Sequence, residues 1–288
     1  MIHSRPTDLA ATAEEGIVVH VKFPGIVLVA VFFLAIQSPE RLRGESSSES
    51  GSGGDGSRIP VLIELFTSEG CSDCPPADAL LQELDRSQPI QGVDLIVLSE
   101  HVDYWDDDGW RDPYSSHAYS ERQRAYANHL ALSSVYTPQM VVDGRYELVG
   151  SDRKQAIVAI ENATKAEKIP VRISSIRTGA GDAVAMRVEA GELPPSIAAT
   201  SADVLIATAD ESDESHVSRG ENAGRTLRHV AVLRSITRVG IVNRSSGFSR
   251  EISVNVKNAS TEHLRIVVIL QETAARRVLG VGSARLSN

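Results

Sequence analysis

The chain has 288 residues, of which 42% are hydrophobic, so it can bury a sizeable core and has the length of about two domains. Its formal net charge is −9, and it has no basic stripe with interleaved aromatic residues, which argues against nucleic-acid binding. No GxSxG, Walker or HExxH motif occurs, so the hydrolase and nucleotide chemistries built on those motifs lack support.

The N-terminal segment has the order of regions found in an export signal. Lys22 precedes an unbroken apolar run at residues 26–36, which is short for a membrane span but suits a signal peptide. We therefore expect export to the periplasm or another extracytoplasmic space. Residues 1–38 are then either a cleaved signal peptide or an anchor whose residues 17–36 tether the chain to a membrane. A flexible Ser/Gly-rich linker is expected at residues 39–58.

The only two cysteines form a Cys-x-x-Cys motif between a predicted strand and a predicted helix. Residues 61–66 are a mostly apolar run, typical of a buried strand, and apolar residues recur at helical spacing over 77–84. Cys71 and Cys74 therefore lie at a helix N-terminus, where free N–H groups and the helix dipole favour a thiolate. We expect Cys71 to attack a disulfide and Cys74 to resolve the mixed disulfide.

Other interpretations of the cysteine pair are open. A structural disulfide that spans so few residues removes little chain entropy, and a zinc site would need a second pair of ligands that the sequence does not supply. Two thiolates could instead hold a soft metal such as Cu(I) in a non-catalytic binding protein, with Met140 as a third ligand. The redox interpretation needs no resident metal and no cofactor.

A second buried strand is predicted at residues 93–99, followed by an acidic, aromatic segment. This segment contains both tryptophans, Trp105 and Trp110, which we expect to cover the dithiol or to contact a substrate. Its carboxylates lack the ligand order of an EF-hand and are read as a solvated loop. His101 is either an acid/base group or metal ligand, or a satisfied polar residue at a strand end. A helix is predicted from about residue 116 to 130.

Thr137 and Pro138 precede a predicted strand at residues 139–142, and the Asp-Gly pair after it predicts a hairpin turn. Proline at the start of a strand is a position where a cis peptide bond can be housed. A strand, a Cys-x-x-Cys motif that opens a helix, a distant proline before a strand, and a hairpin leading into a helix at 152–165 together resemble the thioredoxin fold.

The resemblance implies an α/β thioredoxin-like domain at residues 59–168, with a central mixed sheet flanked by helices. On that likeness, Cys71 is the attacking cysteine and Cys74 the buried resolving cysteine. Pro138 is then the cis-proline that lies against the dithiol and, with Thr137, helps bind the substrate backbone.

A closer resemblance covers the chain from Pro60 to its C-terminus. The stretches FTSEGCSDCPPADALL, YWDDDGWRDP and VYTPQMVVDG are similar to a family of exported bacterial thioredoxin-like proteins catalogued only as a domain of unknown function. The chain departs from thioredoxin in having Ser72-Asp73 between the cysteines and a long acidic insertion before Pro138. Glu64, inside the first strand, is either a buried acid that accepts a proton from Cys74 or an edge-facing, solvated glutamate.

The composition changes at residue 169. Short β-branched runs between turn residues predict a β-rich, sandwich-like domain at residues 169–288. A long polar loop is expected between two of its strands, at residues 210–227, and long loops on β scaffolds often bind a partner. The residues of interest in it are His216, Arg219, Glu221, Asn222 and Arg225.

These expectations combine into an exported thiol-disulfide oxidoreductase that acts on protein or small-molecule disulfides. Its partners would be a disulfide-containing protein or small thiol and a separate redox protein. The alternative is a non-catalytic protein that binds a partner or a soft metal.

Overall fold

The computed structural model describes residues 58–179, 183–256 and 263–287. The expected export segment at residues 1–38 and the linker up to residue 57 lie outside the described residues. Within those ranges, no helix is long and apolar enough to cross a membrane.

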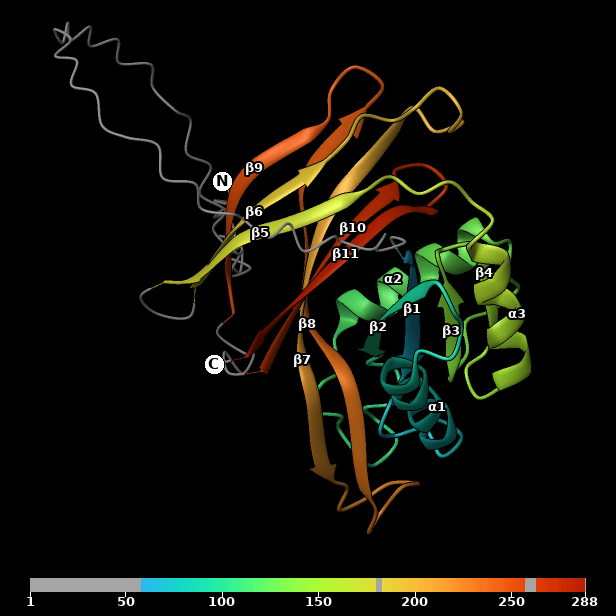
Figure 1. The fold of residues 1–288 in the computed structure, drawn as a ribbon. Coiled ribbons are helices and arrows are strands. Elements are labelled where there is room, and N and C mark those ends of the chain that lie inside the picture. Colours follow the sequence, from blue (N-terminus) through green and yellow to red (C-terminus); the bar gives the residue numbers. More distant parts are fainter. Residues whose placement is uncertain (1–57, 180–182, 257–262, 288) are drawn as a thin grey trace, which may run out of the picture.

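The described part of the chain forms three short helices and eleven strands (Figure 1). The helices are α1 (Pro75–Ser87), α2 (His117–His129) and α3 (Arg153–Ala163). The strands are β1 (Ile59–Thr67), β2 (Val93–His101), β3 (Gln139–Val142), β4 (Tyr146–Val149), β5 (Val171–Thr178), β6 (Ala183–Ala190), β7 (Ser201–His216), β8 (Thr226–Asn243), β9 (Phe248–Asn255), β10 (His263–Glu272) and β11 (Val278–Ser287).

One mixed sheet runs through both halves of the chain. Its strand order is β11-β10-β7-β8-β2-β1-β3-β4, so β8 from the C-terminal half lies beside β2 from the N-terminal half. The two are joined in parallel at Ser99 and Val232. β5, β6 and β9 form a second sheet of three strands, and their inward side chains share an apolar core with β7 and β10.

The predicted fold class, a helix-flanked thioredoxin-like domain followed by a separate β domain, is therefore wrong. The chain is mostly β, and its main sheet has eight strands with only three short helices against it. The physical reason is that β8 occupies the free edge of β2, where a separate N-terminal domain would leave backbone groups unpaired. Two of the short runs predicted after residue 200 are parts of much longer strands, of 16 and 18 residues.

Half of the predicted loop at residues 210–227 is strand. β7 extends to His216 and β8 begins at Thr226, and the two pair in register to their ends. In the last six residues of β7, side chains are alternately half-buried and exposed, and most are polar, so hydrophobicity gives no strand signal there. The β7–β8 hairpin consequently extends well past the rest of the sheet (Figure 1).

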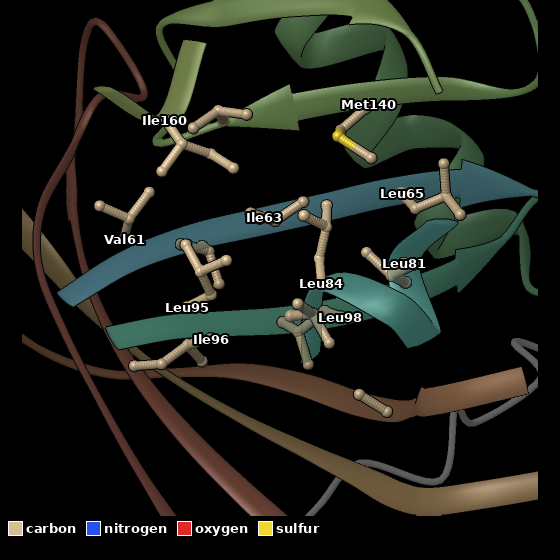
Figure 2. Packing of buried hydrophobic residues seen from close by; sticks show 14 of the residues in the cluster. Val61, Ile63, Leu65, Leu81, Leu84, Leu95, Ile96, Leu98, Met140 and Ile160 are labelled. Carbon is tan, nitrogen blue, oxygen red and sulfur yellow. The ribbon is translucent and has the colours of Figure 1, made fainter. Parts of the chain in front are cut away.

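The main core lies where α1 and α3 pack on β1, β2 and β3. Figure 2 shows Ile63 and Leu65 of β1 beside Leu81 and Leu84 of α1, and all four are buried. α1 begins at two prolines, which lack the N–H donors that a first helical turn leaves unpaired. It ends at Gln88, whose left-handed backbone lets its N–H bond to the carbonyl of Leu84. This packing fixes the start of α1, and with it the cysteine pair, against the sheet.

Candidate functional site

Cys71 and Cys74 form a disulfide at the start of α1. Cys74 has a helical backbone conformation, and its carbonyl accepts hydrogen bonds from the N–H groups of Ala77 (2.8 Å) and Asp78 (3.1 Å). The predicted position of the motif at a helix N-terminus is thus what the structure shows. Cys71 is 2% exposed and Cys74 is fully buried. The disulfide is therefore covered in this conformation.

The loop at residues 217–225, which joins β7 to β8, lies against the backbone of the cysteine motif, and we call it the covering loop. Its Glu221 accepts a hydrogen bond from the Ser72 N–H (3.0 Å), between the two cysteines. Its Asn222 is fully buried and donates through Nδ2 to the carbonyls of Glu69 (2.8 Å) and Cys71 (2.9 Å). Hydrogen bonding to Ser72 lowers the pKa of the Glu221 carboxyl. The end of the hairpin is thus tied to the backbone of the cysteine motif.

The two tryptophans lie beside the residues that precede Cys71. Trp105 donates from Nε1 to Thr137 Oγ1 (2.8 Å), and a Cβ at Gly70 would lie 2.9 Å from the Trp105 Cβ. Gly70 therefore has to be glycine for Trp105 to pack there. Trp110 donates from Nε1 to Glu69 Oε2 (2.8 Å). The acidic, aromatic segment thus forms one wall of the site.

Pro138 lies close to the first turn of α1. The Thr137–Pro138 peptide bond is cis, and the Pro138 carbonyl accepts a hydrogen bond from Gly150 (2.9 Å). A Cβ at Gly150 would meet both Pro138 and Ala77 at 3.1 Å. The structure therefore brings Thr137, Pro138 and the start of α1 into one region.

Glu64 is buried on the other side of the sheet. Because side chains alternate along a strand, it points away from the face on which Ile63 and Leu65 meet α1. Its carboxylate accepts hydrogen bonds from Arg122 Nε (2.8 Å) and Tyr126 OH (2.5 Å) of α2. Glu64 is therefore neither solvated at an edge nor placed beside the disulfide.

The Glu64–Arg122 pair has a second carboxylate next to it. Glu100 Oε1 lies 3.4 Å from Arg122 Nε, and its side chain is completely buried. Burial raises the pKa of the Glu100 carboxyl well above its usual range, and the nearby charge of Glu64 raises it further. The Arg122 guanidinium is thus the cation shared by two buried carboxyl groups, those of Glu64 and Glu100.

A buried group of acids and histidines lies behind the cysteine motif. His229 of β8 places Nε2 3.2 Å from Glu69 Oε1 and Nδ1 3.8 Å from Asp78 Oδ1. Its ring stands edge-on to the ring of His101, with centroids 4.6 Å apart. His101 Nδ1 lies 2.7 Å from Asp112 Oδ2, which also accepts the Glu69 N–H (2.8 Å). These five residues come from four separate parts of the chain.

Two members of this group, His229 and Asp112, have pKa values that are shifted by burial and by their neighbours. Burial alone lowers the pKa of His229, but the facing carboxylates of Asp78 and Glu69 raise it to about 10. Burial raises the pKa of Asp112, but the charge and hydrogen bond of His101 outweigh it, so the pKa ends below its usual value. His229 is therefore an imidazolium at neutral pH, facing two carboxylates.

The described residues contain no group of three or more His, Cys, Asp or Glu side chains arranged to hold a metal ion. Met140, the expected third ligand of a soft metal, is fully buried in the aliphatic core beside Leu65 (Figure 2).

A family model described as "Protein of unknown function (DUF1223)" matches residues 62–271, which is more than half of the chain. The chain belongs to this family. The expected membership of a family of unknown function is thus confirmed, and the DUF1223 description assigns no reaction. No curated protein matches the chain.

Two solved structures resemble this DUF1223 protein over 80% of its length. One is a crystal structure of an Agrobacterium tumefaciens protein, with 25% identity, a TM-score of 0.59 and 96% of its own chain covered. The other is HBP35 of Porphyromonas gingivalis, with 11% identity, a TM-score of 0.58 and 76% of its own chain covered, which shows a likeness of fold alone.

Sequence reasoning found the cysteines, the tryptophans and the proline but missed most of the acid–histidine group. Glu69, Asp78, Asp112 and His229 carry no motif spacing, and His229 reaches the others only because β8 pairs with β2. His101 was predicted to be a satisfied polar residue or a functional one. It pairs with Asp112 through Nδ1, while its buried Nε2 has no partner among the described residues.

Proposed function

We propose that this protein is a thiol-disulfide oxidoreductase that acts on protein or small-molecule disulfides, with Cys71 as the nucleophile and Cys74 as the resolving cysteine. The observation that carries the proposal is the Cys71–Cys74 disulfide at the first turn of α1. The positive end of the helix dipole at that position favours a thiolate. A bridge across so few residues adds little stability by itself, which favours a reactive role over a structural one.

In the reduced protein, the Cys71 thiolate would attack one sulfur of a substrate disulfide. A bond forms between Cys71 Sγ and that sulfur, the substrate disulfide breaks, and the other substrate sulfur leaves as a thiolate. Cys74, deprotonated, then attacks Cys71 Sγ, re-forms the internal disulfide and releases the second substrate thiolate. Two electrons pass from the dithiol to the substrate.

The covering loop must move before a substrate can reach Cys71, because Cys71 is 2% exposed. The contacts that hold the loop are the hydrogen bonds of Glu221 and Asn222 to the backbone of the cysteine motif. Since the sulfurs are buried while these contacts last, the fraction of molecules with an open loop would limit exchange with solvent thiols.

The residues around the opening would bind the substrate. Trp105 and Thr137 are linked by a hydrogen bond and lie next to Pro138, and Trp110 lies beside Glu69 on the same wall. We propose that these side chains contact the substrate once the loop has moved.

Export belongs to the same proposal. Outside the cytoplasm a dithiol is stored as a disulfide unless a partner reduces it, so a separate redox protein would set the direction of electron flow. Residues 1–38 would supply the export signal or the membrane tether.

The test is disulfide exchange by the reduced protein with oxidised glutathione and with a disulfide-bonded peptide. We expect exchange by the wild type, none by Cys71→Ser, and a trapped mixed disulfide with Cys74→Ser. A reduced wild-type protein that exchanges with neither disulfide would contradict the proposal and favour a non-catalytic binding protein.

A further inference from the structure

We propose that Asp78 is the proton acceptor for Cys74, and that His229 is the positioning residue that holds the Asp78 carboxylate in place on the first turn of α1. This inference rests on the proposed function, because it assigns the proton that Cys74 must lose before it resolves the mixed disulfide.

The first support is the position of Asp78 on α1. The backbone of Cys74 is already helical, and the Asp78 N–H bonds to the Cys74 carbonyl, so the two residues are one helical turn apart. Side chains four residues apart on a helix lie on the same face, with Cβ atoms about 5–6 Å apart. Asp78 and the buried Cys74 thus lie on the same face of the start of α1, one turn apart.

The second support is an unmet hydrogen-bonding capacity at this point. Among the described residues, Asp78 Oδ1 and His229 Nδ1 are buried and have no hydrogen-bond partner. They lie 3.8 Å apart, which is too far for a hydrogen bond between them. Buried polar atoms in proteins are rarely left unpaired, so these two call for an explanation. A proton arriving from Cys74 would give Asp78 Oδ1 its missing interaction.

The carboxylates that face His229 keep its imidazole ring protonated. Glu69 contributes a carboxylate from the turn before α1, Asp78 one from α1, and His101 and Tyr114 lie against its ring from β2 and the acidic segment. Burial lowers the pKa of His229, and the carboxylates of Asp78 and Glu69 raise it to about 10. The positive charge of His229 thus lies 3.8 Å from Asp78 Oδ1 and attracts the carboxylate that is to accept the proton.

A route to water exists on the far side of the pair. A cleft of about 540 Å³ between α1 and the β7–β8 hairpin is lined by His229, and a smaller one of about 200 Å³ is lined by Asp78. Arg228 lines both. Because Asp78 lines the smaller cleft, a proton taken from Cys74 can leave through that cleft.

The step balances without another reactant. In the mixed disulfide, the Cys74 thiol gives its proton to the Asp78 carboxylate, and the resulting thiolate attacks Cys71 Sγ. The Cys71–Cys74 bond forms, the bond from Cys71 to the substrate sulfur breaks, and the substrate leaves as a thiolate. Asp78 then loses the proton to water in the clefts.

The experiment is a single turnover of the reduced full-length protein with an aromatic disulfide that releases a coloured thiolate at each step. The first thiolate reports attack by Cys71, and the second reports resolution by Cys74. We expect Asp78→Asn to slow the second phase about 100-fold at pH 7 and to leave the first unchanged, since general-base catalysis contributes about 10²–10⁴-fold. The deficit should shrink as the pH rises and Cys74 ionises without help.

Glu83→Gln is the matched control, because Glu83 is a half-exposed carboxylate on the same helix, and both of its phases should be those of the wild type. His229→Gln should slow only the second phase, by less than Asp78→Asn, and keeps the test valid if Asp78→Asn does not fold. A second phase of wild-type rate in both variants, or a loss that is equal in both phases and at every pH, would overturn the inference. Absence of any coloured thiolate from the wild type would instead refute the proposed function.

Discussion

The covering loop makes a quantitative prediction about how fast the disulfide can be reduced. Asn222 donates two hydrogen bonds to the carbonyls of Glu69 and Cys71, and it is fully buried in doing so. Asn222→Ala removes both bonds. Each hydrogen bond contributes about 0.5–1.5 kcal/mol, so the closed loop should lose about 1–3 kcal/mol relative to the open one.

If the loop opens and closes faster than a thiol attacks, the rate of reduction is proportional to the open fraction. Every 1.4 kcal/mol corresponds to about a tenfold change, so Asn222→Ala should be reduced about 5- to 150-fold faster than the wild type. The assay is a time course with excess dithiothreitol, quenched with acid, in which free thiols are trapped by a maleimide and counted by mass spectrometry.

Asn128→Ala, at an exposed position on α2, is the control and should be reduced at the wild-type rate. Urea unfolding of each variant separates loop opening from global unfolding. Reduction of Asn222→Ala at the wild-type rate or slower would refute the reasoning, because it would mean that Asn222 does not hold the cover in place.

Three further predictions concern the ion pairs of Arg122, the charge of His229 and the pairing of β8 with β2. Arg122→Met leaves Glu64 and Glu100 buried without their cation, so the free energy of unfolding in urea should fall by about 3–5 kcal/mol. Arg124→Met, at an exposed ion pair, should change it by less than about 1 kcal/mol. Equal values for the two variants would contradict the buried network. His229 has its pKa raised from 6.5 to about 10 on folding, so its contribution to stability is complete below about pH 6.5 and is lost as the pH rises through 10. Over that range, the free energy of unfolding in urea should fall more steeply for the wild type than for His229→Gln. Parallel curves for the two proteins would contradict the stabilisation of charged His229 by the facing carboxylates. A fragment of residues 58–168 should show no cooperative thermal unfolding by circular dichroism, because it lacks β8 and exposes the edge of β2. A folded, monomeric fragment would show instead that residues 58–168 are a separate domain.

The local elements were largely predictable from the sequence because their signals are local. The apolar run at residues 61–66, the Pro-Pro pair and the helical spacing after it fixed β1, the cysteine motif and α1 within a few residues of their observed positions. The strand at 139–142 was predicted in the same way, and it matches β3.

The arrangement of the strands was not predictable, because it depends on pairing between distant segments. Nothing in the sequence of β8 marks it as a neighbour of β2, and the outer half of the β7–β8 hairpin consists mainly of polar residues that resemble a loop. The same pairing brings His229 to Glu69 and Asn222 to Cys71. Pairing between distant segments thus decides where His229 lies and what Asn222 contacts, although Asn222 itself is singled out by the sequence.

The most direct test of the proposed function is the reduction potential of the Cys71–Cys74 pair. A protein that begins at residue 58 would be equilibrated with defined ratios of reduced and oxidised glutathione or dithiothreitol, and its thiols would be trapped and counted. The account predicts a reversible equilibrium with a potential between about −270 and −120 mV, the range of known dithiol oxidoreductases. A disulfide that resists reduction throughout, or a pair that never re-forms it, would contradict the account.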